Sequence, residues 1–182
     1  ISLMDVGFYG TYLARARIPV YELGMRRGRL TLAGLAKLYR LIRAIDPDIV
    51  QTWMYHADLI GGVMARLARK GTVVWGIHNS DLSPATTKRT TRMVARLCGK
   101  IAGTIPSKII CCSEQAARAH MHLGYPARKL LVVHNGVDVH EFLPLPASRA
   151  GLRQEWHIGS DEVLFGMVAR WDSQKDHEVF IV

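Results

Sequence analysis

The stretch Asp48-Ile49-Val50-Gln51-Thr52-Trp53 has the composition of a short apolar β-strand, and a helical pattern begins soon after it. Within residues 58–69, Leu59, Val63 and Leu67 recur on one face of the predicted helix. A strand followed directly by a helix is the unit from which parallel sheets are built. This stretch therefore indicates an α/β fold if the same unit recurs along the chain.

The strand-to-helix unit recurs on both sides of this stretch. A helix over residues 35–45 precedes it and ends at Asp46-Pro47, because proline excludes the preceding residue from helical geometry. Ser113 is placed to cap a later helix, and Gly124 to end it. The other predicted elements are strands over 72–77, 108–112 and 130–133 and helices over 86–101 and 114–122. We therefore predict a buried parallel sheet with helices on both faces, which is a doubly wound, Rossmann-like α/β domain.

A second domain is predicted after Pro144 and Pro146, because two prolines within three residues suit a stiff connector. Beyond them the pattern predicts a helix over 149–156, a strand over 162–168 and a helix from Asp176. We predict a first domain over residues 1–145 and the start of a second over 146–182. Residues 1–4 have the pattern of a strand without an earlier partner, and residue 1 is not Met, so we expect an internal piece of a longer protein.

The charge predicts an anionic partner. The chain has 24 Lys and Arg against 15 Asp and Glu, a formal net charge of +9. Nucleic acid, an anionic membrane surface and phosphorylated small molecules all fit this charge. The three cysteines have no metal-ligand spacing, and no apolar run approaches the roughly 18 residues of a membrane-spanning helix. These features favour a cytoplasmic protein.

Polar residues follow each predicted strand, and in open α/β sheets ligands bind at the carboxyl ends of the strands. The candidates for a site are therefore Tyr55, His56 and Asp58 after the first of these strands, His78 and Asn79 after the second, Ser113 after the third, Asn135 after the fourth, and Arg170 and Lys175 in the second domain.

Five motifs in this order resemble those of family 4 glycosyltransferases, which have the two-domain GT-B architecture. They are residues 47–59 (PDIVQTWMYHADL), 76–79 (GIHN), 112–114 (CSE), 135–138 (NGVD) and 168–176 (VARWDSQKD). The resemblance implies two Rossmann-like domains that face a cleft, the first incomplete here at its N-terminus. It also implies a retaining enzyme that moves a sugar from a nucleotide-sugar to a polysaccharide or glycolipid acceptor. The first domain would hold the acceptor and the second the donor.

By this resemblance, Arg170 and Lys175 correspond to a basic pair on the donor diphosphate. Fixed cations in a cleft would stabilise the negative charge that grows on the leaving phosphate, so we expect neither a divalent metal nor another cofactor. The alternative is that both are solvated surface charges. Their position just before a helix N-terminus favours phosphate contact. Asp176 stands where many relatives have glycine.

His78 corresponds to a family histidine near the reaction centre, and we assign it the catalytic role of orienting sugar hydroxyls. A purely structural histidine is the alternative. Tyr55, His56 and Asn79 are expected to bind the acceptor or the sugar.

Three further candidates have equally plausible structural roles. Asp58 and Ser113 fit the acceptor site and a helix cap equally well. For Asn135, a tight turn with Gly136 is favoured over ligand contact.

The predicted helix over 86–101 carries Lys88, Arg92, Arg96 and Lys100 at every fourth position, and no acidic residue occurs between Leu82 and Ser113. Such a face is either simply solvated or suited to an anionic membrane surface or a phosphorylated lipid acceptor. If this helix binds the membrane, the protein would be a peripheral protein on the inner face of the membrane.

Other functions remain as alternatives. Another GT-B enzyme, such as a sugar-nucleotide epimerase or a phosphorylase, fits the same motifs, as does a catalytically silent glycosyltransferase-like module at a membrane. No G-x-G-x-x-G or G-x-x-x-x-G-K-[ST] sequence supports a nicotinamide-dependent oxidoreductase or a P-loop enzyme. Nucleic-acid binding rests on charge alone and ranks last. We expect residues 1–182 alone to lack transferase activity.

Overall fold

Four parallel strands form one sheet in a computed structural model that describes residues 1–26, 28–172 and 175–181. They are β1 (Ile49–Trp53), β2 (Thr72–Ile77), β3 (Lys108–Cys111) and β4 (Leu130–Val132). Their order in the sheet is β1-β2-β3-β4, and each strand runs parallel to its neighbours. The strands predicted over 48–53, 72–77, 108–112 and 130–133 are thereby confirmed, and so is the α/β class.

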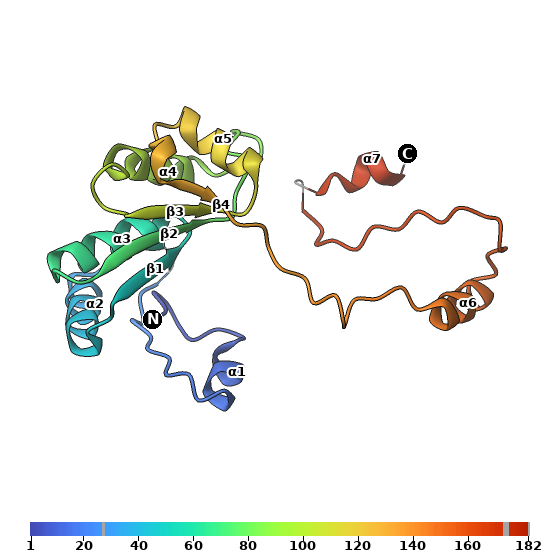
Figure 1. Cartoon of the computed structure of the whole chain (residues 1–182), viewed down its shortest axis with the longest axis horizontal. Helices are drawn as coiled ribbons and strands as arrows, with labels where there is room; N and C mark the ends of the chain where they lie inside the picture. The colour runs from blue at the N-terminus through green and yellow to red at the C-terminus, as the bar shows by residue number, and fades with distance from the viewer. Residues whose placement is uncertain (27, 173–174, 182) are drawn as a thin grey trace. The chain divides into compact units, whose positions relative to one another are not determined.

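Helices connect these strands (Figure 1). They are α2 (Leu32–Ile45) before β1, α3 (Tyr55–Leu67), α4 (Arg89–Ile101), α5 (Glu114–His122) and the short 3₁₀ turn η1 (Ala127–Lys129) before β4. The hydroxyl of Thr31 accepts a hydrogen bond from the Gly34 amide at the start of α2. In the same way, Ser113 Oγ accepts a hydrogen bond from the Ala116 amide at 3.1 Å. The predicted cap of α5 is therefore confirmed.

The main core lies on one face of the sheet. Val73, Trp75, Ile77, Ile109 and Cys111 alternate along β2 and β3, are fully buried, and pack against alanines of α3, α4 and α5. Residues on the other face are open, with Ile49 60%, Trp53 53% and Leu131 44% exposed.

Within the described residues, the connecting helices thus cover one face, and the prediction of helices on both faces is wrong. Because the strands follow one another in order and such crossovers are right-handed, every connecting helix falls on the same side.

A smaller cluster holds the N-terminal segment against the helices. Leu23 and Met25 pack with Leu38 of α2 and Ile60 of α3. The segment contains the short helix α1 (Gly10–Arg15) and one parallel bridge between Ser2 and Glu22. The strand predicted over residues 1–4 is therefore reduced to this bridge.

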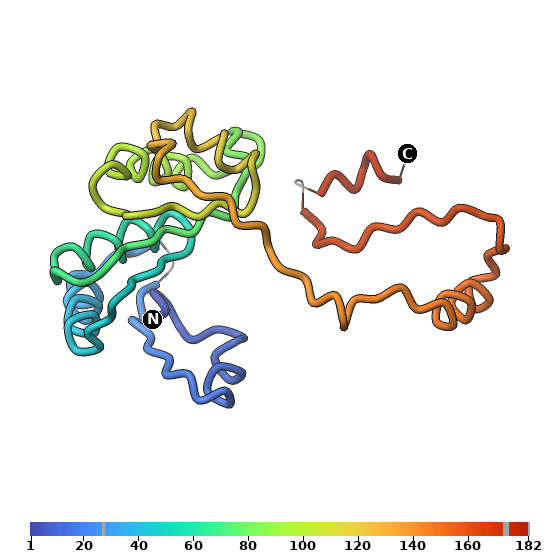
Figure 2. Tube along the Cα trace, in the orientation of Figure 1, coloured from blue at the N-terminus to red at the C-terminus, as the bar shows by residue number. Residues whose placement is uncertain are grey.

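The chain divides into two compact units, residues 1–134 and 135–182. The second contains α6 (Pro146–Glu155) and α7 (His177–Ile181), and the described residues between them have little regular structure (orange to red in Figure 2). The strand predicted over 162–168 does not form, because no described neighbour pairs with it, and Val163 and Phe165 are exposed. The division at residue 145 stays a prediction.

Candidate functional site

His78 lies at the carboxyl end of β2, directly after the buried Ile77. Its ring is exposed and lies against Trp53 at the end of β1, with ring centroids 4.8 Å apart and planes inclined by 39°. Two neighbouring strands therefore deliver an imidazole and an indole to the edge of the sheet where ligands bind in this class of fold. The catalytic role of His78 stays a prediction.

Tyr55 points into the protein and hydrogen bonds to His120 of α5, with 2.9 Å between its hydroxyl oxygen and Nε2. His120 Nδ1 lies 2.7 Å from the Ala116 carbonyl oxygen. Because a carbonyl can only accept, Nδ1 donates to it, and Nε2 is left to accept the proton of the Tyr55 hydroxyl. Burial lowers the pKa of His120 and raises the pKa of Tyr55, so both groups are neutral.

His120 is not among the residues that the motifs single out. The spacing of Ala116, Ala117 and His120, all on the buried face of α5, is the one sequence signal that points to it. The structure places Tyr55 with this histidine, beneath the sheet edge. An acceptor-binding role for Tyr55 stays a prediction.

Asp58 is fully buried beside Thr52 of β1, whose hydroxyl donates to Asp58 Oδ1 at 2.6 Å. Its second oxygen, Oδ2, has no hydrogen-bonding partner among the described residues. Burial raises the pKa of Asp58 to about 7, although the hydrogen bond from Thr52 acts in the opposite direction. The cap interpretation of Asp58 is wrong, because α3 begins at Tyr55 and Asp58 already lies within its first turn.

Asn79 shapes the loop between β2 and α4. Its Oδ1 accepts from the Asp81 amide at 3.1 Å, and its Nδ2 donates to Thr87 Oγ1 at 3.5 Å. His56, by contrast, is exposed on the first turn of α3. Ser113 is occupied as the cap of α5. Ligand contact by these three residues stays a prediction.

The turn predicted at Asn135-Gly136 is wrong, because no turn forms there and the chain turns at residues 139–141 instead. The reason is Asp138, whose Oδ1 accepts from the amides of His140 at 2.8 Å and Glu141 at 3.2 Å. Asn135 itself is exposed and belongs to the second unit. Its contact with a ligand stays a prediction.

Arg170 and Lys175 are exposed in the loop before α7. The Lys175 amide donates to the Asp172 carbonyl at 2.9 Å, and His177 lies 2.8 Å from the Arg170 carbonyl through Nε2. His177 also stacks on Trp171, with centroids 4.7 Å apart. Residues 173 and 174 of the same motif lie outside the described residues. The two basic residues flank one short loop, and their phosphate role stays a prediction.

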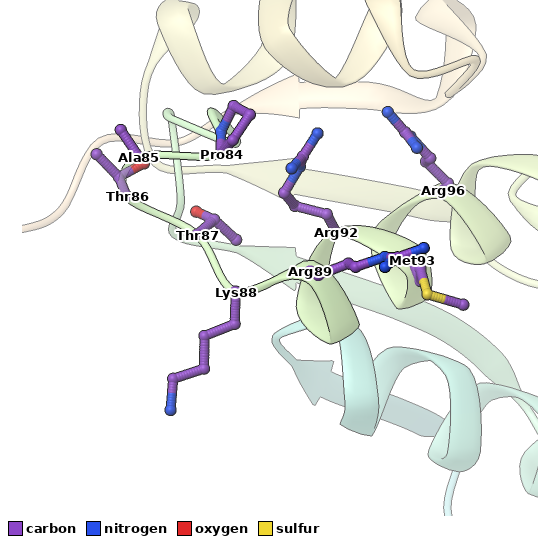
Figure 3. Close-up of a pocket in the computed structure, with 9 residues that line it drawn as sticks. All are labelled: Pro84, Ala85, Thr86, Thr87, Lys88, Arg89, Arg92, Met93 and Arg96. Atoms are coloured by element: carbon purple, nitrogen blue, oxygen red, sulfur yellow. The ribbon is translucent and has the colours of Figure 1, made fainter.

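A pocket of about 690 Å³ opens at the start of α4 (Figure 3). The helix begins at Arg89, slightly later than the predicted residue 86. Thr87, which lines the pocket, is tied to Asn79 as described and also donates to the Asp81 carbonyl at 2.9 Å. The basic helix that the sequence predicts therefore has a hollow at its first turns, which its periodicity alone does not reveal.

Cys98 and Cys111 are buried thiols, whereas Cys112 is half-buried. Burial raises the pKa of Cys98 to about 12 and that of Cys111 to about 11. In the part of the chain that the structure describes, no group of three or more His, Cys, Asp or Glu side chains could hold a metal ion. Over the same residues, no helix is both long and apolar enough to cross a membrane.

Comparison with known proteins gives consistent matches. A family described as Glycosyltransferase Family 4 matches residues 7–141. The Escherichia coli UDP-Gal:alpha-D-GlcNAc-diphosphoundecaprenol alpha-1,3-galactosyltransferase is 28% identical over 148 residues, which are 80% of this chain and 38% of that protein.

Solved structures of Anabaena Alr3699/HepE share the fold. The complex with UDP has a TM-score of 0.68 at 23% identity and covers 86% of this chain and 41% of its own. The complex with UDP-glucose has a TM-score of 0.66 at 24% identity and covers 91% and 44%. The chain thus spans about two fifths of the length of each of these relatives.

Proposed function

This chain belongs to glycosyltransferase family 4, and we propose on that basis that the protein transfers a sugar from a nucleotide-sugar to a saccharide or lipid-linked acceptor with retention of configuration. The observation that carries the proposal is the family match over residues 7–141, together with a parallel sheet whose carboxyl edge presents His78. The fold is that of a Rossmann-like domain of GT-B glycosyltransferases.

On the donor side, Arg170 and Lys175 are the residues proposed to hold the diphosphate. Cations fixed near the leaving group stabilise its growing negative charge in a closed site without a metal ion. The complexes of Alr3699/HepE with UDP and UDP-glucose support a uridine nucleotide as the carrier of the sugar.

In the first unit, His78 is proposed to orient hydroxyls of the donor sugar near the reaction centre. It is exposed at the sheet edge, and its ring packs on Trp53, an aromatic face suited to the apolar side of a sugar ring. The Escherichia coli relative acts on an acceptor linked to diphosphoundecaprenol, which supports a lipid-linked acceptor here. The basic face of α4, from Lys88 to Lys100, would then lie at an anionic membrane surface, on the cytoplasmic side.

A transfer assay tests this proposal. The protein expressed from its own gene is incubated with uridine-diphosphate sugars and a GlcNAc-diphospholipid, and the product is separated and its anomeric configuration read by NMR. We expect a new glycoside with the configuration of the donor, and a large loss of kcat for His78→Ala. Hydrolysis without transfer across a panel of sugars and acceptors, or an inverted product, would contradict the proposal.

A further inference from the structure

The pocket at the first turns of α4 gathers basic side chains on one site. Lys88, Arg89, Arg92 and Arg96 line it together with Thr87 and Met93. Figure 3 shows Arg92 and Arg96 extending from the same side of the helix, whereas Lys88 points away from them. These two arginines are one helical turn apart, a spacing of about 6 Å along the axis.

The positive charge of this pocket is not neutralised by the protein. Within the described residues, none of its four basic side chains forms an ion pair, the one salt bridge being that of Lys70 with Asp46. The nearest carboxylate in the sequence, Asp81, is engaged by Ser83 and by the hydroxyl of Thr86. Among the described residues, Asp81 is the single carboxylate beside four basic side chains and pairs with none of them, so the pocket keeps a net positive charge that attracts an anion.

The first turn of α4 adds to the positive electrostatic potential of the pocket. The capping position is Lys88, whose side chain accepts no hydrogen bond, and the first turn contains no acidic residue. The amides that begin the helix therefore lack a side-chain acceptor, and the positive end of the helix dipole points toward the pocket. Backbone amides and guanidinium groups together form a donor set that fits phosphate oxygens, which arginine can bind in a bidentate manner.

The pocket also has an apolar wall and lies close to the proposed acceptor site. Met93 lines it and is exposed, which suits a hydrocarbon chain next to a charged group. Thr87 links it through Asn79 to the loop that starts at His78. A phosphate held here would leave the attached sugar near the carboxyl edge of the sheet.

We propose that this pocket, formed by Thr87, Arg92, Arg96 and the first turn of α4, binds the phosphate or diphosphate group of a phosphorylated acceptor. The proposal rests on the proposed function, which it deepens by naming a phosphate ester as the anchor of the acceptor. Phosphate esters also occur in bulk membrane lipids. A pocket with two arginines selects a single phosphate headgroup, whereas a flat charged face binds the membrane surface as a whole.

Binding of inorganic diphosphate, measured by isothermal titration calorimetry with saturating UDP present to occupy the proposed donor site, tests the pocket. We expect saturable binding that weakens by about 10-fold or more in Arg92→Gln and in Arg96→Gln, since each loses a charge-assisted hydrogen bond. Arg118→Gln on α5 removes the same group outside the pocket, and Lys100→Gln removes a charge from the last turn of the same helix. Both controls should change the affinity less than about 2-fold. Circular dichroism verifies that each variant is folded.

Sedimentation with phosphatidylcholine vesicles separates the two sources of phosphate. Vesicles that contain a small fraction of a long-chain prenyl diphosphate should recruit the wild-type protein and Arg118→Gln, but not Arg92→Gln. The proposal is overturned if diphosphate does not bind, if Arg92→Gln and Arg96→Gln bind it as tightly as the wild type, or if the prenyl-diphosphate vesicles recruit Arg92→Gln as well as the wild type. If diphosphate binds at the pocket but no sugar is transferred, the proposed function is contradicted and the pocket is not. If sugar is transferred but diphosphate does not bind at the pocket, only the pocket proposal is contradicted.

Discussion

The hydroxyl of Tyr55 and Nε2 of His120 lie 2.9 Å apart, and they join the first turn of α3 to the buried face of α5. Both side chains are almost entirely buried. A tyrosine from the motif after β1 is thus fixed by a residue 65 positions later in the chain. This hydrogen bond ties two of the helices behind the sheet edge to each other.

Tyr55→Phe should destabilise the protein by about 1–3 kcal/mol, because it leaves the buried Nε2 of His120 without a hydrogen-bond donor. Urea denaturation followed by circular dichroism measures the difference. Tyr39→Phe is the matched control, since Tyr39 is exposed on α2 and should be nearly neutral. Equal stabilities of the two variants would show that the contact contributes nothing.

Asp58 should give the protein a stability that declines as the pH rises. Its pKa is 3.8 when unfolded and about 7 when folded. Between these values the folded protein keeps a proton that the unfolded chain has lost, so the free energy of unfolding falls through this window and levels off above it. Asp58→Asn should flatten that decline in urea denaturation at a series of pH values.

His120 makes the opposite contribution to the pH dependence of stability, so it must be separated from that of Asp58. Burial lowers its pKa below the ordinary 6.5, so its contribution to stability is lost as the pH falls, opposite to that of Asp58. Because His120 is present in both proteins, subtracting the Asp58→Asn profile from that of the wild type removes its contribution. Parallel profiles would mean that Asp58 ionises normally in the folded state.

Gly62→Ala should destabilise the protein by about 1–3 kcal/mol through overpacking. A Cβ atom there would lie 2.8 Å from both the Ile105 side chain and Trp75 Nε1 in the core behind α3. Gly151→Ala on α6 is the control, because a Cβ added there would meet no described atom within 4 Å apart from its chain neighbours and the backbone of its own helix, and alanine favours a helix. A melting temperature that is unchanged for Gly62→Ala would refute the close packing of α3 on β2.

Arg170→Ala and Lys175→Ala should each lower kcat by roughly 10²–10³-fold, with a smaller change in KM for the donor, if the two cations act on the departing diphosphate. Steady-state kinetics of the protein expressed from its own gene decides this. Lys37→Ala, on the exposed side of α2, is a charge-matched control that should retain full activity. Wild-type kcat in both loop variants would identify them as ordinary surface charges.

The four strands and the helices α2 to α5 of the first unit could be predicted from the sequence because their signals are local, whereas α1 was not predicted. The apolar run over 72–77 and the serine before α5 each encode their structure within a few residues. The segment 162–168 has an equally strong strand pattern, yet it forms no strand, because a strand also needs a neighbour to hydrogen bond with it. Strand propensity therefore predicts a β-strand only where a neighbouring strand is present to pair with it.

The candidate site was less predictable, because its contacts join distant parts of the chain. Asp58 has the spacing of a cap, but the helix begins three residues earlier and carries it inward to Thr52. The sequence pattern likewise places basic residues along α4 but cannot show that the loop before the helix leaves a hollow beside them. The alternation of strands and helices in the sequence predicts which residues lie at the strand ends. The direction of each side chain, by contrast, depends on tertiary packing.

The burial of Cys98 and Cys111 has a practical consequence for following the protein by spectroscopy. Thiol reagents attack the thiolate, and both side chains are shielded from solvent and hold their protons far above neutral pH. Cys112 lies at the end of β3, next to Ser113 and partly open to solvent. A maleimide fluorophore should therefore attach at Cys112 of the natural sequence, so no engineered cysteine is needed. Its emission would report on sugars or nucleotides that bind at the sheet edge.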